Sequence, residues 1–262
     1  MSSIPKIEKI RIAEVPVHRL SIQEAEEEIC RRIREQIKTH VVFINAAKVV
    51  KYQYDASLRH VIERAELAFA DGVPVVWASR LYRESLTGRV NGTDLMERMI
   101  ERAAQDGFRI FLLGGRQDVV EEVAAVYRRR YPALQIAGMR SGYFSGEEEE
   151  DVILQINQSR ADLVLIGMST PRKELWADTA LSRLDVAVCQ GVGGSFDVIA
   201  GRVARAPVWM QRSGLEWFYR LLQEPRRMGP RYLATNPLFV WLILKDTVRR
   251  WTAGWSGKGL QP

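Results

Sequence analysis

Short apolar runs alternate with longer amphipathic segments through the first two thirds of the chain. The apolar runs predict strands, because a strand that is buried on both faces of a sheet is apolar or β-branched throughout. The amphipathic segments predict helices. We expect strands at residues 8–15, 41–45, 66–70, 108–113, 134–138, 162–167 and 186–190. We expect helices at residues 21–37, 46–64, 74–83, 93–106, 117–130, 147–159 and 172–183.

Strands that alternate with helices predict an α/β fold, with a Rossmann-like, mostly parallel sheet flanked by helices. The pattern changes near residue 205, where tryptophan, arginine and proline replace the glycine-bounded strands. We therefore predict an α/β body over residues 1–205, a helical, Arg- and Trp-rich appendage over 206–251, and a flexible tail over 252–262.

Prolines divide the predicted appendage. Proline lacks the backbone N–H that a helix interior needs, so it usually ends or breaks a helix. We expect short helices, one over 208–223 and one over 237–251. The prolines that would separate the short helices are Pro207, Pro225, Pro230 and Pro237.

Composition narrows the classes of function. Of the 262 residues, 47% are apolar and 27% are charged, so the chain can bury a core. The net charge of +6 favours phosphorylated ligands, anionic lipid or nucleic acid. Acidic stretches at 24–28 and 147–151 argue against a surface that binds polyanions in general, so no nucleic-acid partner is expected.

Cysteine usage and hydropathy indicate a compartment. The two cysteines, Cys30 and Cys189, provide neither a disulfide framework nor a metal-ligand cluster, so we expect a reducing environment and no metal site. Residues 1–10 lack the apolar core of a secretory leader. No run of eighteen apolar residues is present, so no simple membrane-spanning helix is expected.

The densest chemical signal lies between residues 191 and 232. A glycine-rich turn that carries Asp197 is followed by seven arginines and no lysine. Arginine offers a planar fork of donors that matches phosphate oxygens two at a time, so the stretch predicts a pocket for a ligand with several phosphates. The alternative is a solvated basic helix face, against which we weigh Trp209 and Trp217. The arginines are Arg202, Arg205, Arg212, Arg220, Arg226, Arg227 and Arg231.

Polar residues follow several of the predicted strands, and ligands of open α/β sheets bind beyond the carboxyl ends of strands. Asp71 could act as a general base if a substrate hydroxyl reaches it, or it could simply cap a helix. Tyr143 could stack on a nucleobase or lie in the core. Asp197 could accept hydrogen bonds from a base or ribose, or serve as a helix N-terminal charge.

Further candidate binding residues surround two other predicted helix starts. Arg89 could face an anion, while in the Asn91–Asp94 segment Thr93 or Asp94 could cap the helix that follows. We take Arg89, Asn91 and Asp94 as substrate-binding candidates. Lys173 could meet a phosphate or be an ordinary surface lysine. Gly114 and Gly115 form a weaker phosphate-binding signal, because no complete dinucleotide fingerprint is present.

An amphipathic segment near the C-terminus resembles a membrane-surface helix. The apolar block Leu238–Leu244 has basic residues on both sides and tryptophans at 241, 251 and 255. This composition is typical of a helix that lies on an anionic bilayer. Packing against the body or against a neighbouring subunit is the equal alternative.

Separate segments along the chain carry a family resemblance. They are NAAK at 45–48, ADGVP at 70–74, RVNGTDL at 89–95, LGG at 113–115, SGYF at 141–144, GGSFD at 193–197, RAP at 205–207, GLEWFYR at 214–220 and EPRR at 224–227. In this order, over residues 41–233, they resemble the WecG/TagA/CpsF family of bacterial glycosyltransferases.

The resemblance implies a metal-independent, inverting glycosyltransferase, and no cofactor is expected. Such an enzyme moves a sugar of the N-acetylmannosamine type, or a related hexose or uronic acid, from a UDP-sugar to a polyprenyl-diphosphate-linked sugar. It works peripherally at the cytoplasmic face of the membrane, in the synthesis of teichoic acid linkage units, enterobacterial common antigen, capsule or exopolysaccharide. The family also suggests that subunits associate, so a homo-oligomer is possible.

The resemblance also assigns roles to residues. Asp71 stands where the family has its proposed general base, and Asn45 stands near the donor. Tyr143 and Asp197 stand at nucleotide-contacting positions. The arginines that close over the site from the appendage correspond to Arg220 and Arg227, with Arg231 nearby.

Two departures from the family pattern concern the donor. Phe43 stands where the family often has threonine, and Lys173 stands where it often has glutamine. Lys173 could add charge for a diphosphate or recognise an acidic sugar. A non-catalytic nucleotide-binding α/β module is the alternative function.

Overall fold

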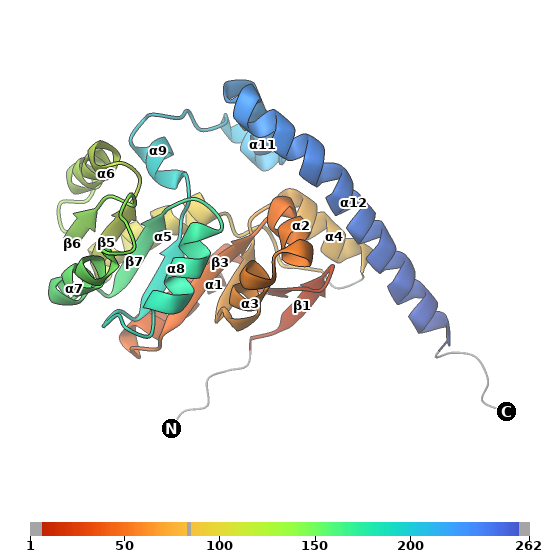
Figure 1. Cartoon of the computed structure of the whole chain (residues 1–262), viewed down its shortest axis with the longest axis horizontal. Coiled ribbons are helices and arrows are strands. Elements are labelled where there is room, and N and C mark those ends of the chain that lie inside the picture. The colour runs from red at the N-terminus through yellow and green to blue at the C-terminus, as the bar shows by residue number, and fades with distance from the viewer. Residues whose placement is uncertain (1–6, 83–84, 257–262) are drawn as a thin grey trace.

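The computed structural model describes residues 7–82 and 85–256, and its centre is a six-stranded sheet with helices on both faces (Figure 1). The strand order is β4-β3-β8-β7-β5-β6, and every neighbouring pair is parallel. This confirms the predicted α/β, Rossmann-like fold. The strands are β3 (Thr39–Ile44), β4 (Leu67–Ala70), β5 (Arg109–Gly114), β6 (Gln135–Arg140), β7 (Leu163–Gly167) and β8 (Val188–Gly191).

The first apolar run forms a hairpin instead of the single strand expected at 8–15. β1 (Lys9–Ile12) pairs with β2 (Val15–His18) in antiparallel fashion. The turn between them holds Ala13 and Glu14 at φ values of 46° and 70°. Neither residue type is one that usually marks such a turn, so the sequence did not indicate it. The His18 Nδ1 atom accepts a hydrogen bond from the Ala68 N–H at 2.8 Å, which joins the hairpin to β4.

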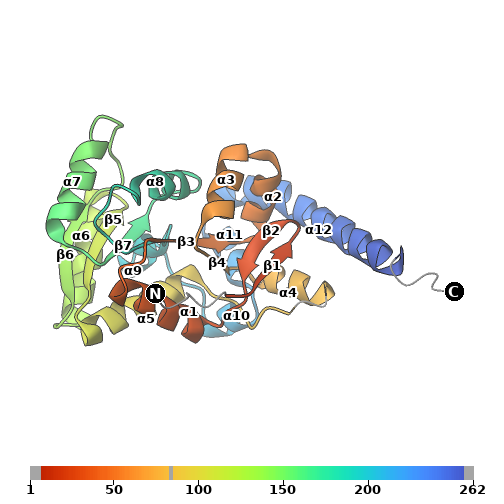
Figure 2. The same cartoon turned by 90° about the horizontal axis from the view of Figure 1, so that it is seen from below.

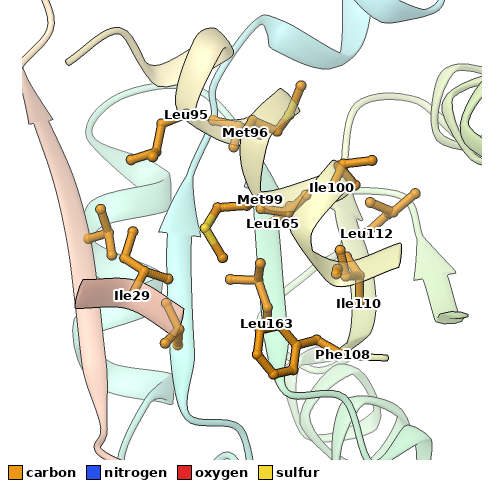
Figure 3. Close-up of a cluster of buried hydrophobic side chains, with 14 of the residues drawn as sticks. Ile29, Leu95, Met96, Met99, Ile100, Phe108, Ile110, Leu112, Leu163 and Leu165 are labelled. Atoms are coloured by element: carbon orange, nitrogen blue, oxygen red, sulfur yellow. The ribbon is translucent and has the colours of Figure 1, made fainter. Parts of the chain in front are cut away.

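Three helices share a core with one face of the sheet: α1 (Ile22–Arg34), α5 (Gly92–Asp106) and α6 (Gln117–Arg130). Their apolar side chains lie against those of β5 and β7 (Figure 3). The opposite face carries α2 (Ala46–Tyr54), α3 (Ala56–Arg64), α7 (Glu149–Ser159) and α8 (Arg172–Ala180). Apolar residues alternate between the two cores along β3, as expected for a strand covered on both sides.

Helix boundaries follow their capping residues. Ser21 and Glu24 form the expected capping box of α1. The single helix predicted at 46–64 is two helices, because Asp55 ends α2 and its side chain accepts the Leu58 N–H at 2.9 Å as the cap of α3. α4 (Val73–Leu81) and the short α9 (Ser195–Ile199) each follow a strand at its carboxyl end.

The C-terminal region forms α10 (Val208–Arg212), α11 (Glu216–Gln223) and α12 (Pro225–Ser256). The single helix expected at 208–223 is divided at Gly214, whose φ is 76°. The expectation that Pro230 and Pro237 separate short helices was wrong, because both lie inside α12. Both prolines are exposed, so water can pair the carbonyls that lack an intrahelical partner.

α12 is packed against the body along its middle and extends beyond it (Figures 1 and 2). Phe239, Leu242 and Ile243 are buried and belong to the same core as α2, α4 and the hairpin. The tail predicted from residue 252 starts later, since the helix continues to Ser256, and residues 257–262 lie outside the described part of the chain. The domain boundary near residue 205 stays a prediction.

Candidate active site

The carboxyl ends of all six sheet strands lie along one edge, because the strands are parallel. Asp71 follows β4, Asn45 follows β3, the Gly191–Asp197 turn follows β8, and Lys173 follows β7. The order of the strands places these four segments next to one another in that sequence. This is the place where open α/β sheets bind their ligands.

One carboxylate at this edge is anchored by a single oxygen. Asp71 Oδ1 accepts hydrogen bonds from Asn91 Nδ2 and from the Gly92 N–H, both at 3.0 Å. None of the described residues donates to Oδ2, and the side chain is partly exposed. Burial raises the pKa of Asp71, and the Gly92 N–H and Arg89 offset only part of that rise. Asp71 does not cap α4, whose N-cap is Gly72, so the capping alternative is excluded.

Asn91 joins this carboxylate to the start of α5. Its Oδ1 atom accepts the N–H groups of Thr93 and Asp94, at 3.0 and 3.2 Å, while its Nδ2 donates to Asp71. Asn91 is therefore the N-cap of α5, and the expectation that Thr93 or Asp94 fills that role was wrong. Thr93 Oγ1 lies 2.8 Å from Ser195 Oγ, which ties α5 to α9.

Arg89 and Asp94 are bound to charges rather than free. Arg89 Nη1 lies 3.2 Å from Glu216 Oε2, and its Nη2 lies 3.8 Å from Asp94 Oδ2. Asp94 also pairs with Arg205. Asp94 and Arg205 line an open polar groove of about 520 Å³, together with Arg98 and Arg130.

Asn45 lies beside the turn that carries Asp71. Its Oδ1 atom accepts the Lys48 N–H at 3.0 Å and so caps α2. A Cβ placed on Gly72 would lie 3.8 Å from the Asn45 Cβ. The Asn45 amide N–H groups have no acceptor among the described residues, so they remain available to a ligand.

Lys173 is buried, which contradicts its interpretation as a surface lysine. Its side chain is 9% exposed, and its ammonium donates to Thr170 Oγ1 and lies 2.8 Å from Glu174 Oε1. Lys48 lies 2.6 Å from the same Glu174 oxygen. Burial and the neighbouring Lys48 lower the pKa of Lys173 to about 8, against the effect of Glu174.

The candidate nucleotide residues lie farther along the edge. Tyr143 is 74% exposed, so its placement in the core is excluded. The turn that carries it folds back toward β5, because the Gly142 N–H donates to the Gly115 carbonyl at 2.9 Å. Asp197 lies in the first turn of α9 with a partly exposed side chain.

The C-terminal helices contact the Asp71 turn directly. A Cβ on Gly214 would lie 2.8 Å from Val73 Cγ2, so the backbone between α10 and α11 lies against the start of α4. Arg220 comes four residues after Glu216 on α11, so it shares the helix face that Glu216 turns to Arg89. The side chains of Arg227 and Arg231 lie outside the described residues.

The sequence matches the family model described as glycosyl transferase WecG/TagA/CpsF family over residues 10–253. The chain belongs to this family. Membership makes it a glycosyltransferase, with a sugar-nucleotide donor and a sugar acceptor. Within the described residues, none of the helices combines the length and the hydropathy needed to cross a bilayer.

In this WecG/TagA/CpsF-type chain the sequence pattern did not reveal four charged residues: Lys48, Glu174, Arg205 and Glu216. Three of them stand in segments that carry the resemblance, and Arg205 is one of the arginines of the basic stretch. Their partners are far away in sequence: Glu216 pairs with a residue 127 positions earlier, and Arg205 with one 111 positions earlier. A single sequence holds no signal for such pairs.

Proposed function

We propose that the chain transfers a sugar, with inversion, from a UDP-sugar to a polyprenyl-diphosphate-linked sugar. The acceptor hydroxyl loses its proton to Asp71 while its oxygen bonds to the anomeric carbon of the donor. The bond from that carbon to the β-phosphate oxygen breaks on the opposite face, and UDP leaves. General-base assistance of this kind typically contributes about 10²- to 10⁴-fold to a rate.

The observation that carries the proposal is the state of the Asp71 carboxylate. One oxygen is held by Asn91 and Gly92, and the other has no donor among the described residues. A base needs this combination, because it must be fixed in direction and still have an oxygen free for a proton. Its place at the carboxyl edge of β4 is where the fold binds ligands.

Charge on the departing UDP is assigned to the C-terminal arginines. Arg220 has no acid partner among the described residues and shares a helix face with Glu216, which reaches toward the Asp71 turn through Arg89. Arg227 follows in the first turn of α12, and Arg231 one turn later. Donors fixed in advance around developing charge stabilise a transition state strongly.

The other candidate residues divide between the two ends of the donor. Tyr143 and Asp197 are assigned to the nucleotide, since their side chains are at least partly exposed at the ends of β6 and β8. Asn45 and Asn91 are assigned to the sugar region, because each lies next to Asp71. Arg89, Asp94 and Lys173 complete the proposed binding site.

A lipid-linked acceptor requires contact with the inner face of the cell membrane, and α12 supplies a surface for it. The residues at 240, 244 and 248, together with Trp241 and Trp251, are between 51% and 64% exposed. They lie opposite the buried face of the helix, with Lys245 5.0 Å from the ring of Trp241. Association of subunits at this membrane remains part of the proposal.

Replacement of the base tests the proposal. We expect Asp71→Asn to lower product formation by at least about 10²-fold, because the amide cannot accept the proton. Binding of UDP, measured by calorimetry, should remain. Product mass is followed with a panel of UDP-sugars and a short-chain lipid diphosphate sugar acceptor. Asp55→Asn is the matched control, since asparagine still caps α3.

Two outcomes would contradict this assignment. Near-normal turnover by Asp71→Asn would remove Asp71 from the role of base. A wild-type chain that binds UDP but forms product with no donor in the panel would favour the non-catalytic nucleotide-binding alternative.

A further inference from the structure

Two lysines share one carboxylate beneath the site. Glu174 Oε1 lies 2.6 Å from Lys48 Nζ and 2.8 Å from Lys173 Nζ, and it accepts a hydrogen bond from Thr170 Oγ1 at 3.1 Å. The side chains of Lys48, Lys173 and Glu174 are 5%, 9% and 2% exposed. All three are thus nearly removed from water, and together they carry one net positive charge.

The surplus positive charge has no protein partner at ion-pair distance. Glu174 is the only acid that pairs with either lysine among the described residues. Burial would raise the pKa of Glu174, but the two ammonium groups overcome that effect and hold it at about 2. A buried charge without compensation is costly, so proteins retain it where an ion or ligand completes the balance.

Hydrogen-bond capacity distinguishes the two lysines. Lys48 donates to the Phe43 carbonyl at 2.7 Å as well as to Glu174, which fixes it at the end of β3. Lys173 donates to Thr170 and Glu174, and its third N–H has no acceptor among the described residues. The free donor and the surplus charge therefore coincide on Lys173.

Lys173 lies at the turn that follows β8. A Cβ on Gly191 would lie 3.2 Å from the Lys173 Cε, and one on Gly193 would lie 4.0 Å from its Nζ. Glycine at both positions leaves room for this ammonium at the carboxyl edge of the sheet. The charges of Lys173 and Asp71 also act on each other, since Asp71 raises the pKa of Lys173.

This arrangement points to the sugar part of the donor, if the proposed function holds. Asp71 must lie beside the anomeric carbon in that reaction, and the diphosphate is assigned to the C-terminal arginines. An anion that completes the balance at Lys173 therefore belongs to the sugar ring. We propose that Lys173 binds a carboxylate on the donor sugar, and that the preferred donor is a UDP-hexuronate.

Lys48 and Glu174 act as positioning residues in this proposal. Glu174 orients the Lys173 ammonium, and Lys48 fixes Glu174 from the other side. Without Lys48, Glu174 would neutralise Lys173 and leave no surplus charge for a ligand. The pair of lysines thus explains why a buried acid and a buried base still present a positive site.

Matched donors test the inference. Wild-type chain is assayed with UDP-glucuronate and UDP-glucose, and with UDP-N-acetylmannosamine and its uronate, under one set of acceptor conditions. We expect the uronate of a pair to have a kcat/KM about 10- to 100-fold higher, the range of one hydrogen bond to a charged group. Lys173→Gln should remove most of this preference, and Lys173→Arg should keep part of it. Lys51→Gln, an exposed lysine on α2, is the control and should keep the preference.

Binding separates this inference from the proposed function. Calorimetry with the same four nucleotides and no acceptor should show tighter binding of the uronates by wild type, even if no product forms. Tighter uronate binding without product would overturn the proposed function and support the inference. Equal affinity and equal turnover for acidic and neutral donors would overturn the inference alone.

Two controls keep the variants interpretable. If Lys173→Gln weakens both members of a pair equally, the ammonium contacts the diphosphate, and the inference is wrong. Thermal unfolding by circular dichroism checks that each variant folds. Should Lys173→Gln fail to fold, the preference of the wild-type chain decides the matter.

Discussion

At the scale of single residues, the chain sets the basicity of Asp71 by opposing effects. Burial disfavours the charged carboxylate and raises its pKa, whereas the Gly92 N–H and the charge of Arg89 favour the ionised form. The net shift is upward, so the base becomes ionised at a higher pH than an exposed aspartate. Activity that needs the ionised form should therefore fall as the pH drops through this raised pKa.

Asn91 offers a direct test of this balance. Asn91→Asp replaces the donor to Asp71 Oδ1 with a second carboxylate, and two close carboxylates resist joint ionisation. We expect the acidic limb of the kcat/KM profile to move to higher pH by about one unit or more, which corresponds to about 1.4 kcal/mol. Aspartate caps helices as well as asparagine does, so the melting temperature should change little.

The comparison variant is Asn91→Ala, which removes both the donor and the cap. It should lower the free energy of unfolding by about 1 kcal/mol through the loss of the α5 cap alone. A pH profile of Asn91→Asp that superimposes on that of the wild type would show that Asn91 has no influence on the base.

At the scale of elements, the sequence predicted what local pattern controls. Apolar runs located every strand of the main sheet, and the position of Asp71 and Asn45 at strand ends followed from that. Turns without glycine, proline or asparagine escaped prediction, as at Ala13 and Glu14. So did α12, in which packing of Phe239 and its neighbours on the body outweighs the helix-breaking tendency of Pro237.

Long-range charge pairs were equally beyond the sequence. Lys173 was interpreted as a surface residue because nothing near it in sequence indicates that α2 supplies Lys48 to the same carboxylate. The ion pair between Arg89 and Glu216 depends on how α11 meets the loop before α5, which only the folded chain determines.

The contact between the C-terminal helices and the Asp71 turn leads to a prediction for one glycine. Gly214→Ala places a Cβ 2.8 Å from Val73 Cγ2, at a φ of 76° that disfavours any other residue. We expect at least a tenfold loss of turnover, because α11 and Arg220 can no longer seat next to Asp71; a misplacement of about 1 Å can cost about 10²-fold. Steady-state kinetics with the full chain measures this loss.

Gly201→Ala is the matched control for backbone strain. Gly201 has a similar φ of 71°, but nothing lies within 4 Å of the position of its Cβ. It should therefore show the cost of strain, about 1 kcal/mol in stability, without the loss of turnover. Recovery of activity by the double variant Gly214→Ala, Val73→Ala would attribute the loss to the contact, and equal activity of both glycine variants would refute it.

At the scale of the whole molecule, α12 divides its two faces between the body and the outside. Phe239, Leu242 and Ile243 are buried in the core that α2 and the hairpin share. Arg250 lies over the ring of Tyr82 at 4.2 Å and donates to the Arg11 carbonyl at 2.6 Å. The helix is therefore fixed to the α/β body, and its other face moves with the active-site edge as one unit.

The outward face of α12 then determines how the enzyme meets a membrane. Leu244 is 57% exposed at the centre of the apolar stripe, so Leu244→Asp should weaken binding to phosphatidylglycerol vesicles by at least about tenfold, through lost apolar burial and an added negative charge. Leu154→Asp on α7 is the control, since Leu154 is 55% exposed on the body. Sedimentation with vesicles measures both variants. Because α12 carries its buried face on the core, neither change should lower the melting temperature appreciably. Equal loss of binding by the two variants would place the membrane contact elsewhere, and full binding by Leu244→Asp would leave the stripe without this role.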